Sequence, residues 1–131
     1  MKKEIIAAIA ITLTSNVSHA ICKQSDNAGR WDGIVSFTDG TGKFMAAKCQ
    51  YNYDTAGNLS NGWCMYPNGA KSTLVSGTIT LSGDCVMTGT VLDNNNVTIN
   101  LNANMSRGKD SGVGVYWTNN GLYGTYSAVR Y

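Results

Sequence analysis

The chain holds few of the side chains that do chemistry in enzymes. Its single histidine is His19, and its single glutamate is Glu4. Both lie in residues 1–20, which have a basic start, an apolar middle and small residues at positions 18 and 20. This layout is typical of a secretory signal peptide, so we expect cleavage after Ala20. The remaining chain, residues 21–131, has no imidazole to activate a nucleophile or to bind zinc.

The seven aspartates do not suggest an acid–base pair either. Asp26 precedes the first expected strand, and Asp32 lies within it. The others stand among residues that mark turns: Asp39, Asp54, Asp84, Asp93 and Asp110. No two of these carboxylates have a spacing that implies joint general acid–base work. We therefore expect a protein that is not an enzyme and that uses no cofactor or metal ion.

Four cysteines follow the expected signal peptide: Cys22, Cys49, Cys64 and Cys85. An even number in a small exported chain favours two disulfides. A structural zinc site is the alternative, but no two of these cysteines form the Cys-x-x-Cys pair that such sites use. We interpret the cysteines as structural.

The size and charge of the chain bear on its domain number and on the partners that it can bind. Residues 21–131 suit a single domain, and they carry eight basic residues against seven aspartates, a net charge of +1. This balance does not favour a nucleic-acid partner. After position 20 no apolar run is long enough to cross a membrane as a helix. The start of the signal peptide looks bacterial, which favours a periplasmic or extracellular location. The sequence leaves the oligomeric state open.

The elements that would position any site are short strands. Residues 97–105 are apolar at every odd position and Thr or Asn at every even one, which predicts a strand with one buried face. Similar runs separated by Gly, Asn, Asp and Ser predict seven more strands, at about 30–37, 43–53, 61–66, 72–81, 85–91, 113–118 and 122–130. No connection is long enough for a crossover helix.

Eight consecutive antiparallel strands form an up-and-down meander, and a meander either closes on itself or exposes two edges. We predict an all-β fold in which about eight strands close into a small barrel. A flattened sandwich or an open sheet is the alternative.

The meander also predicts which cysteines pair. In a hairpin with its loop near residues 56–57, Cys49 lies directly opposite Cys64, as a cross-strand disulfide requires. Cys22 precedes the first strand and Cys85 begins the fifth. Odd-numbered strands of a meander all begin at the same end, so these two cysteines should meet there.

Two segments resemble a known family. Gly29-Arg30-Trp31 opens the first expected strand, and Arg130 stands near the end of the last. This resembles the calycin pattern of lipocalins, fatty-acid-binding proteins and avidins. In that group Gly-x-Trp opens strand one, and a basic residue from the chain's end packs over the indole. The resemblance implies that Gly29, Trp31 and Arg130 close one end of the barrel as structural residues. On neighbouring closing strands, Trp31 and Arg130 would form a cation–π contact.

The opposite end is the expected mouth of the barrel. It is formed by the turns at 38–42, 67–71, 92–96 and 119–121, and the aromatic residues near it are Tyr66, Tyr116 and Trp117, with Phe37 just below. Such aromatics beside Asn-rich loops suit a ligand or a partner, although they equally suit core packing. Trp63, beside Cys64, is a further candidate if its side chain is exposed.

These observations predict an exported binding protein. We expect the rim loops or outer surface to bind a protein or glycan partner, as an inhibitor- or adhesin-like protein does. The alternative is a carrier for a small amphipathic ligand inside a calycin-like barrel. Small eight-stranded barrels are often filled by side chains, and five residues could fill this one: Val75, Ile79, Leu81, Ile99 and Leu101. An apolar cavity above roughly 300 Å³ would favour the alternative.

Overall fold

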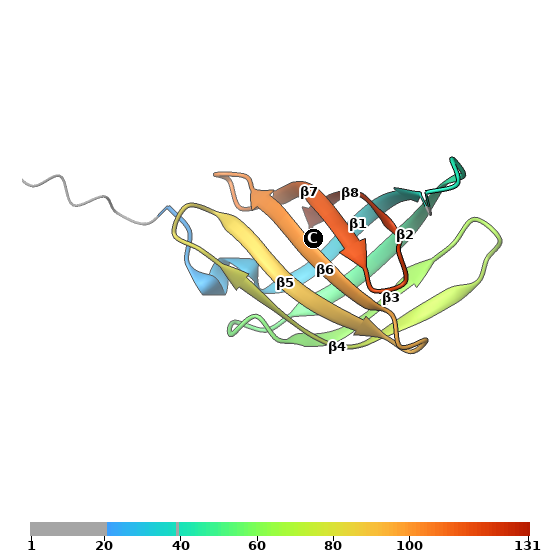
Figure 1. The fold of residues 1–131 in the computed structure, drawn as a ribbon. Coiled ribbons are helices and arrows are strands. Elements are labelled where there is room, and N and C mark those ends of the chain that lie inside the picture. The colour runs from blue at the N-terminus through green and yellow to red at the C-terminus, as the bar shows by residue number, and fades with distance from the viewer. Residues whose placement is uncertain (1–20, 39) are drawn as a thin grey trace, which may run out of the picture.

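Eight antiparallel strands form a closed barrel in which each strand pairs with its neighbours in the sequence (Figure 1). The computed structural model describes residues 21–38 and 40–131, so the expected signal peptide and Asp39 lie outside the described residues. The strands are β1 (Gly29–Thr38), β2 (Phe44–Tyr53), β3 (Leu59–Met65), β4 (Lys71–Leu81), β5 (Val86–Asp93), β6 (Thr98–Met105), β7 (Ser111–Thr118) and β8 (Tyr123–Arg130). A short 3-10 helix, η1 (Gln24–Asn27), precedes β1.

The first and last strands close the barrel. β1 pairs with β8 from Trp31 opposite Arg130 to Thr38 opposite Tyr123. This pairing removes the two strand edges that an open meander would leave. The predicted all-β meander of eight strands is confirmed, and the strand ends lie within two residues of the predicted ones. The alternative of an open sheet or sandwich is wrong.

Most hairpins of the barrel share one short turn. In the β5–β6 hairpin, Asp93 N–H donates to Val97 O at 3.0 Å, and Asn96 N–H donates to Asp93 O at 3.2 Å. The fourth residue of the turn has a positive φ, 59° at Asn96 and 87° at Gly57 of the β2–β3 hairpin. Asn and Gly tolerate this conformation best. The same two backbone bonds recur in the β2–β3, β3–β4, β4–β5 and β7–β8 hairpins.

Trp31 seals the end of the barrel where β1 begins. Its side chain is 1% exposed, and its Nε1–H donates to the carbonyl oxygen of Asn27 at 3.0 Å. The Arg130 guanidinium lies over the indole, 5.1 Å from the ring centre. The expected cation–π contact is therefore present, and Met87 and Met105 are buried with Trp31 in the core.

The segment before β1 covers this closed end. The sequence did not predict η1, whose Gln24 side chain bonds to β4: Nε2 donates to Ile79 O at 2.7 Å, and Oε1 accepts from Leu81 N–H at 2.8 Å. Lys109 Nζ lies 2.7 Å from Asp26 Oδ2, which joins η1 to the β6–β7 turn. In Figure 1, η1 lies close to the β4–β5 hairpin.

Both predicted disulfides are confirmed. Cys49 and Cys64 are direct partners in the β2–β3 register, with Cα atoms 4.1 Å apart. Cys22 and Cys85 meet at the closed end, with Cα atoms 5.1 Å apart. The described residues contain no free cysteine.

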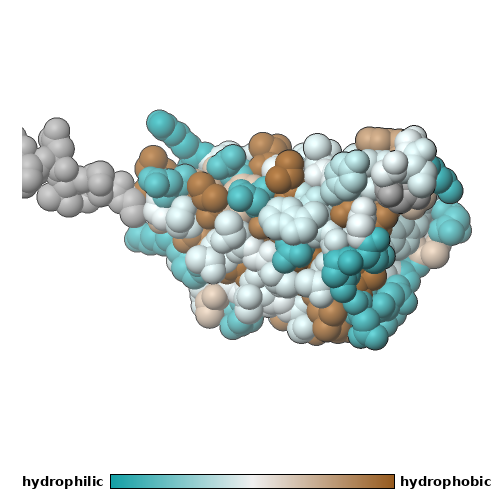
Figure 2. Space-filling model, viewed as in Figure 1, coloured by the Kyte–Doolittle hydropathy of each residue, from teal (hydrophilic) through white to brown (hydrophobic). Residues whose placement is uncertain are grey.

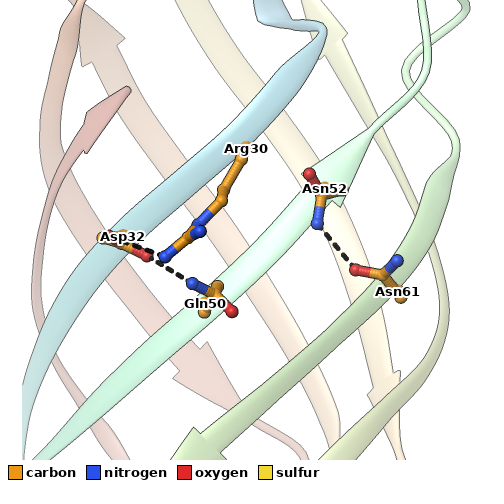
Figure 3. A network of polar contacts seen from close by, with 5 residues as sticks. All are labelled: Arg30, Asp32, Gln50, Asn52 and Asn61. Atoms are coloured by element: carbon orange, nitrogen blue, oxygen red, sulfur yellow. Dashed lines mark hydrogen bonds and ion pairs between the residues drawn. The ribbon is translucent and has the colours of Figure 1, made fainter. Parts of the chain in front are cut away.

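Polar side chains on β1, β2 and β3 contact one another across the strands (Figure 3). Gln50 Nε2 donates to Asp32 Oδ1 at 3.0 Å, and Arg30 Nη2 lies 3.5 Å from Asp32 Oδ2. Asn52 Nδ2 donates to Asn61 Oδ1 at 2.7 Å. On the face seen in Figure 2, residues of intermediate hydropathy predominate, and the hydrophobic spots are small and scattered.

One residue expected to fill the barrel points outward instead. Val75 is 53% exposed, because a bulge between Leu74 and Ser76 shifts the inward positions of β4 from even to odd numbers. Ile79 and Leu81 follow the bulge and are 3% and 5% exposed. These two therefore belong to the core, whereas Val75 does not.

The two disulfides should contribute unequally to stability. Their sequence separations are 63 residues for Cys22–Cys85 and 15 for Cys49–Cys64. Loop entropy then predicts a loss of about 4 kcal/mol for the Cys22→Ser, Cys85→Ser variant and about 3 kcal/mol for the Cys49→Ser, Cys64→Ser variant. Urea unfolding of both variants measures the free energies. An equal or larger loss at the Cys49–Cys64 bridge would contradict this ranking.

Candidate functional site

The barrel contains a cavity of about 400 Å³ that reaches the rim hairpins β5–β6 and β7–β8. Every strand contributes to its lining, which is mostly apolar and aromatic: Val35, Phe37, Ala47, Cys49, Tyr51, Tyr53, Cys64, Tyr66, Ser72, Leu74, Val91, Asp93, Asn95, Val97, Ile99, Leu101, Tyr116, Thr118, Asn120, Leu122 and Tyr126. At the rim, Asn95 and Asn120 are exposed. Ile99 and Leu101, expected to fill the lumen, form part of its wall.

Three tyrosines lie at the end of the cavity nearest the Trp31 plug. The hydroxyls of Tyr51 and Tyr126 hydrogen-bond to each other, and Tyr51 is the register partner of Trp31. The Tyr53 ring packs against Tyr51 with ring centres 5.5 Å apart. Burial raises the pKa of both Tyr51 and Tyr53, so these phenols are neutral donors and acceptors at neutral pH.

A second aromatic group lies near the rim. The Phe37 and Tyr66 rings meet edge to face with centres 6.3 Å apart. Tyr116 is 6% exposed, and its hydroxyl is buried without a hydrogen-bond partner in the structure. Burial raises the pKa of Tyr116, and the nearby Tyr66 phenol adds to this effect. Tyr116 is thus a residue of the cavity wall whose neutral, buried hydroxyl has no partner among the described residues, which is costly for stability.

The structure divides the predicted binding residues between two faces. Tyr66 and Tyr116 line the cavity. Trp117 follows Tyr116 on β7, points to the other face of the sheet and is 47% exposed. Trp63 is half-buried on β3, and Lys71 Nζ lies 5.0 Å from its ring centre. The four residues thus do not form one site.

The polar cavity residues that sequence reasoning missed include Tyr51, Tyr53, Tyr126 and Asp93. The alternation of inward and outward side chains along β2 and β8 could have indicated that these tyrosines face the interior. Tyr51 and Tyr53 share the inward phase of Cys49, and Tyr126 shares that of Ala128. Asp93 was assigned to a turn only. It belongs to the turn, and it is also 4% exposed and faces the cavity.

A shallow groove of about 330 Å³ lies on the outer face of β4 to β7. The residues that line it are neutral, and most are polar: Thr78, Thr80, Thr88, Gly89, Thr90, Asn100, Leu101, Asn102 and Trp117. Thr90 Oγ1 donates to Asn100 Oδ1 at 3.1 Å, and Asn100 is the register partner of Trp117. This groove is separate from the cavity and opens to the outside.

Within residues 21–38 and 40–131, no group of three or more His, Cys, Asp or Glu side chains is arranged to hold a metal ion. No helix in the same part of the chain has the length and apolar character that a membrane span needs.

The buried tyrosines predict a loss of stability at alkaline pH. Burial raises the pKa of Tyr126 to about 12 and raises those of Tyr51, Tyr53 and Tyr116 above their usual value of 10.0. Above about pH 10 the unfolded chain releases protons that the folded protein keeps, so the free energy of unfolding falls. Each tyrosine contributes up to about 1.4 kcal/mol per pH unit. Below about pH 10 these tyrosines do not make the free energy of unfolding depend on pH.

Urea unfolding at increasing pH measures this loss. Tyrosinate absorbance of the native protein should rise at higher pH than that of the urea-unfolded chain. Superimposable titration curves for the two states would contradict the prediction.

Comparison with known proteins supports the barrel architecture of the chain but identifies no family. No protein family matches this chain, and no curated protein resembles it in sequence. Among solved structures, it is similar to a de novo designed fluorescence-activating β-barrel, with a TM-score of 0.60 and 12% identity over 84% of this chain and 99% of that one. It is also similar to a redesigned β-barrel, with a TM-score of 0.58 and 14% identity over 82% and 94% of the two chains. The chain thus has the architecture of small eight-stranded β-barrels.

Proposed function

We propose that this protein binds a small, mainly apolar molecule inside its barrel without transforming it. The observation that carries the proposal is the cavity of about 400 Å³ with its mostly apolar and aromatic wall. Small-molecule sites in proteins begin at roughly 300 Å³ and combine such walls with a few polar groups. An apolar molecule lying against this wall would gain dispersion contacts and leave water, and both effects favour binding.

The two ends of the barrel support a carrier with one entrance. Trp31 and Arg130 block the end near η1, whereas exposed Asn95 and Asn120 border the cavity at the rim. A ligand would enter between the β5–β6 and β7–β8 hairpins. The contact between Trp31 and Arg130 also supports the calycin-like character that Gly29-Arg30-Trp31 suggested. Membership of that group remains part of the proposal.

Export is the second part of the proposal. Two disulfides in a domain this small are typical of exported proteins, because reducing compartments keep thiols free. Together with the signal-peptide pattern of residues 1–20, they support a periplasmic or extracellular carrier.

A matched pair of substitutions tests the interior site. Ala47 faces the cavity, and Ala46, one position earlier on β2, faces the other side of the sheet. Ala47→Leu should fill part of the cavity and weaken binding of the neutral dye N-phenylnaphthylamine by about tenfold or more. Ala46→Leu should leave it unchanged. Dye fluorescence measures the affinity, and thermal unfolding confirms that both variants fold.

Equal dye binding by wild type and Ala47→Leu, or a loss confined to Ala46→Leu, would contradict an interior site. Absence of dye binding by the wild type would contradict the proposed function itself.

The groove beside Trp117 favours a second candidate function, binding of a glycan on the outer surface. Its lining offers hydroxyl and amide groups without charge, and Trp117 supplies an exposed aromatic face on which a sugar ring can stack. A protein partner could use the same face. The groove is shallower than the cavity and largely open to solvent, so the interior site remains the first candidate.

Substituting each of the two outward tryptophans distinguishes glycan binding at the groove from binding elsewhere on the outer surface. Trp117→Ala should abolish binding to any neutral glycan retained from an immobilised panel, because the stacking surface is lost. Trp63→Ala, on the outer face of β3, should keep it. A panel on which the wild type retains no glycan would rule this candidate out.

A further inference from the structure

Two hairpins at opposite ends of the barrel contain the same aspartate turn. At the closed end, Asp54 Oδ1 accepts the N–H groups of Ala56 at 2.9 Å and Asn58 at 2.8 Å. At the rim, Asp93 Oδ1 accepts those of Asn95 at 2.8 Å and Val97 at 2.9 Å. The side chain has the same structural task in both places.

That task does not require a negative charge. In the β4–β5 hairpin Ser82 Oγ accepts the Val86 N–H at 3.1 Å, and in the β7–β8 hairpin Thr118 Oγ1 accepts the Leu122 N–H at 3.0 Å. Neutral hydroxyls therefore serve the corresponding position of two further turns. The carboxylate of Asp93 is one choice among several that the turn allows.

Asp93 differs from Asp54 in its burial and in its place beside the cavity. Asp54 is exposed, whereas Asp93 is 4% exposed and lies in the wall of the cavity. Among residues 21–38 and 40–131, no Lys, Arg or His lines the cavity. In the described part of the chain, Asp93 forms no ion pair, since the two ion pairs there involve Asp32 and Asp26. A bound cation would supply the countercharge that the described residues of the cavity wall do not.

The second observation is the Tyr116 hydroxyl. It belongs to a residue of the same cavity wall, it is buried, and it has no hydrogen-bond partner among the described residues. It can accept a hydrogen bond from an ammonium N–H, and its raised pKa keeps it neutral. The neighbouring aromatic rings of Phe37 and Tyr66 also favour a positive charge near their faces.

From these groups we infer that the natural ligand is a hydrophobic amine. Its apolar body occupies the barrel, and its protonated amino group is held by the Asp93 carboxylate and the Tyr116 hydroxyl. Fatty-acid-like anions are disfavoured, because their head group would meet Asp93 without a cation to compensate. This inference rests on the proposed interior site and names the class of molecule that it selects.

Three probes with the same alkyl chain test the inference: decylamine, decanol and decanoate. Each competes with N-phenylnaphthylamine at neutral pH, below its micelle concentration, where decylamine is cationic and decanoate anionic. Wild-type protein should bind decylamine about tenfold or more tightly than decanoate, with decanol between them. Asp93→Asn keeps the turn acceptor and should weaken decylamine binding about tenfold while strengthening decanoate binding. Asp54→Asn, the same change in the matching turn, should alter neither affinity.

Tyr116→Phe tests the second group. It should weaken decylamine and decanol about threefold to tenfold, since both lose a hydrogen-bond acceptor. Unchanged binding of both probes would overturn the role of Tyr116.

The outcomes separate this inference from the proposed function. If decanol displaces the dye but decylamine binds no better than decanoate, or Asp93→Asn leaves their ratio unchanged, the inference fails and the interior site stands. If the dye and all three probes fail to bind, the interior site fails, and the inference fails with it.

Discussion

The structure depends on the hydrogen-bonded pairing of its first and last strands. β1 and β8 pair along almost their whole length, from Trp31 and Arg130 at one end to Thr38 and Tyr123 at the other. Without this pairing the meander would be an open sheet with two edges and no enclosed interior. Closure also fixes which side chains face inward, because side chains alternate along every strand. The cavity is therefore a consequence of this closure.

The two ends of the closed barrel differ in what covers them. At the end near η1, Trp31 and the disulfide of Cys22 with Cys85 fill and cover the opening. At the rim, the hairpins are held by their own side chains: Asn94 Oδ1 accepts the Thr73 N–H at 3.0 Å, and Asn119 Oδ1 accepts the Thr98 N–H at 3.0 Å. These two asparagines continue the hydrogen bonding between strands into the rim hairpins, and their side chains do not fill the lumen. The Asn-rich rim thus supports the mouth of the cavity.

Much of the fold could be predicted from the sequence, because local patterns determine it. Alternation over 97–105 and regularly spaced turn residues indicated the strands, and the register of one hairpin indicated the Cys49–Cys64 bridge. The bulge in β4 could not be predicted, since it leaves the composition of the strand unchanged and only shifts its phase. For that reason Val75 was wrongly expected in the interior.

The candidate site was less predictable for a different reason. Tyr116 and Trp117 are adjacent at the rim in sequence, yet the pleat places one inside the barrel and the other outside. Their position along β7 was predicted, but their faces were not distinguished. The size of the lumen depends on how side chains from all eight strands pack together, which no local pattern specifies. Asp93 has a sequence context typical of any turn, and only the closed barrel reveals that this residue is buried and lines the cavity.

Methyl resonances followed by NMR during titration with N-phenylnaphthylamine test the central claim most directly, because they report where the molecule binds. Ala47, Leu74 and Val91 line the cavity and not the outer groove, whereas Val113 and Val115 are 58% and 51% exposed on the outer face of β7. A ligand held inside the barrel should shift the first group of methyl signals and leave the second in place. Shifts confined to Val113 and Val115, or no shifts at saturating probe, would contradict binding within the barrel.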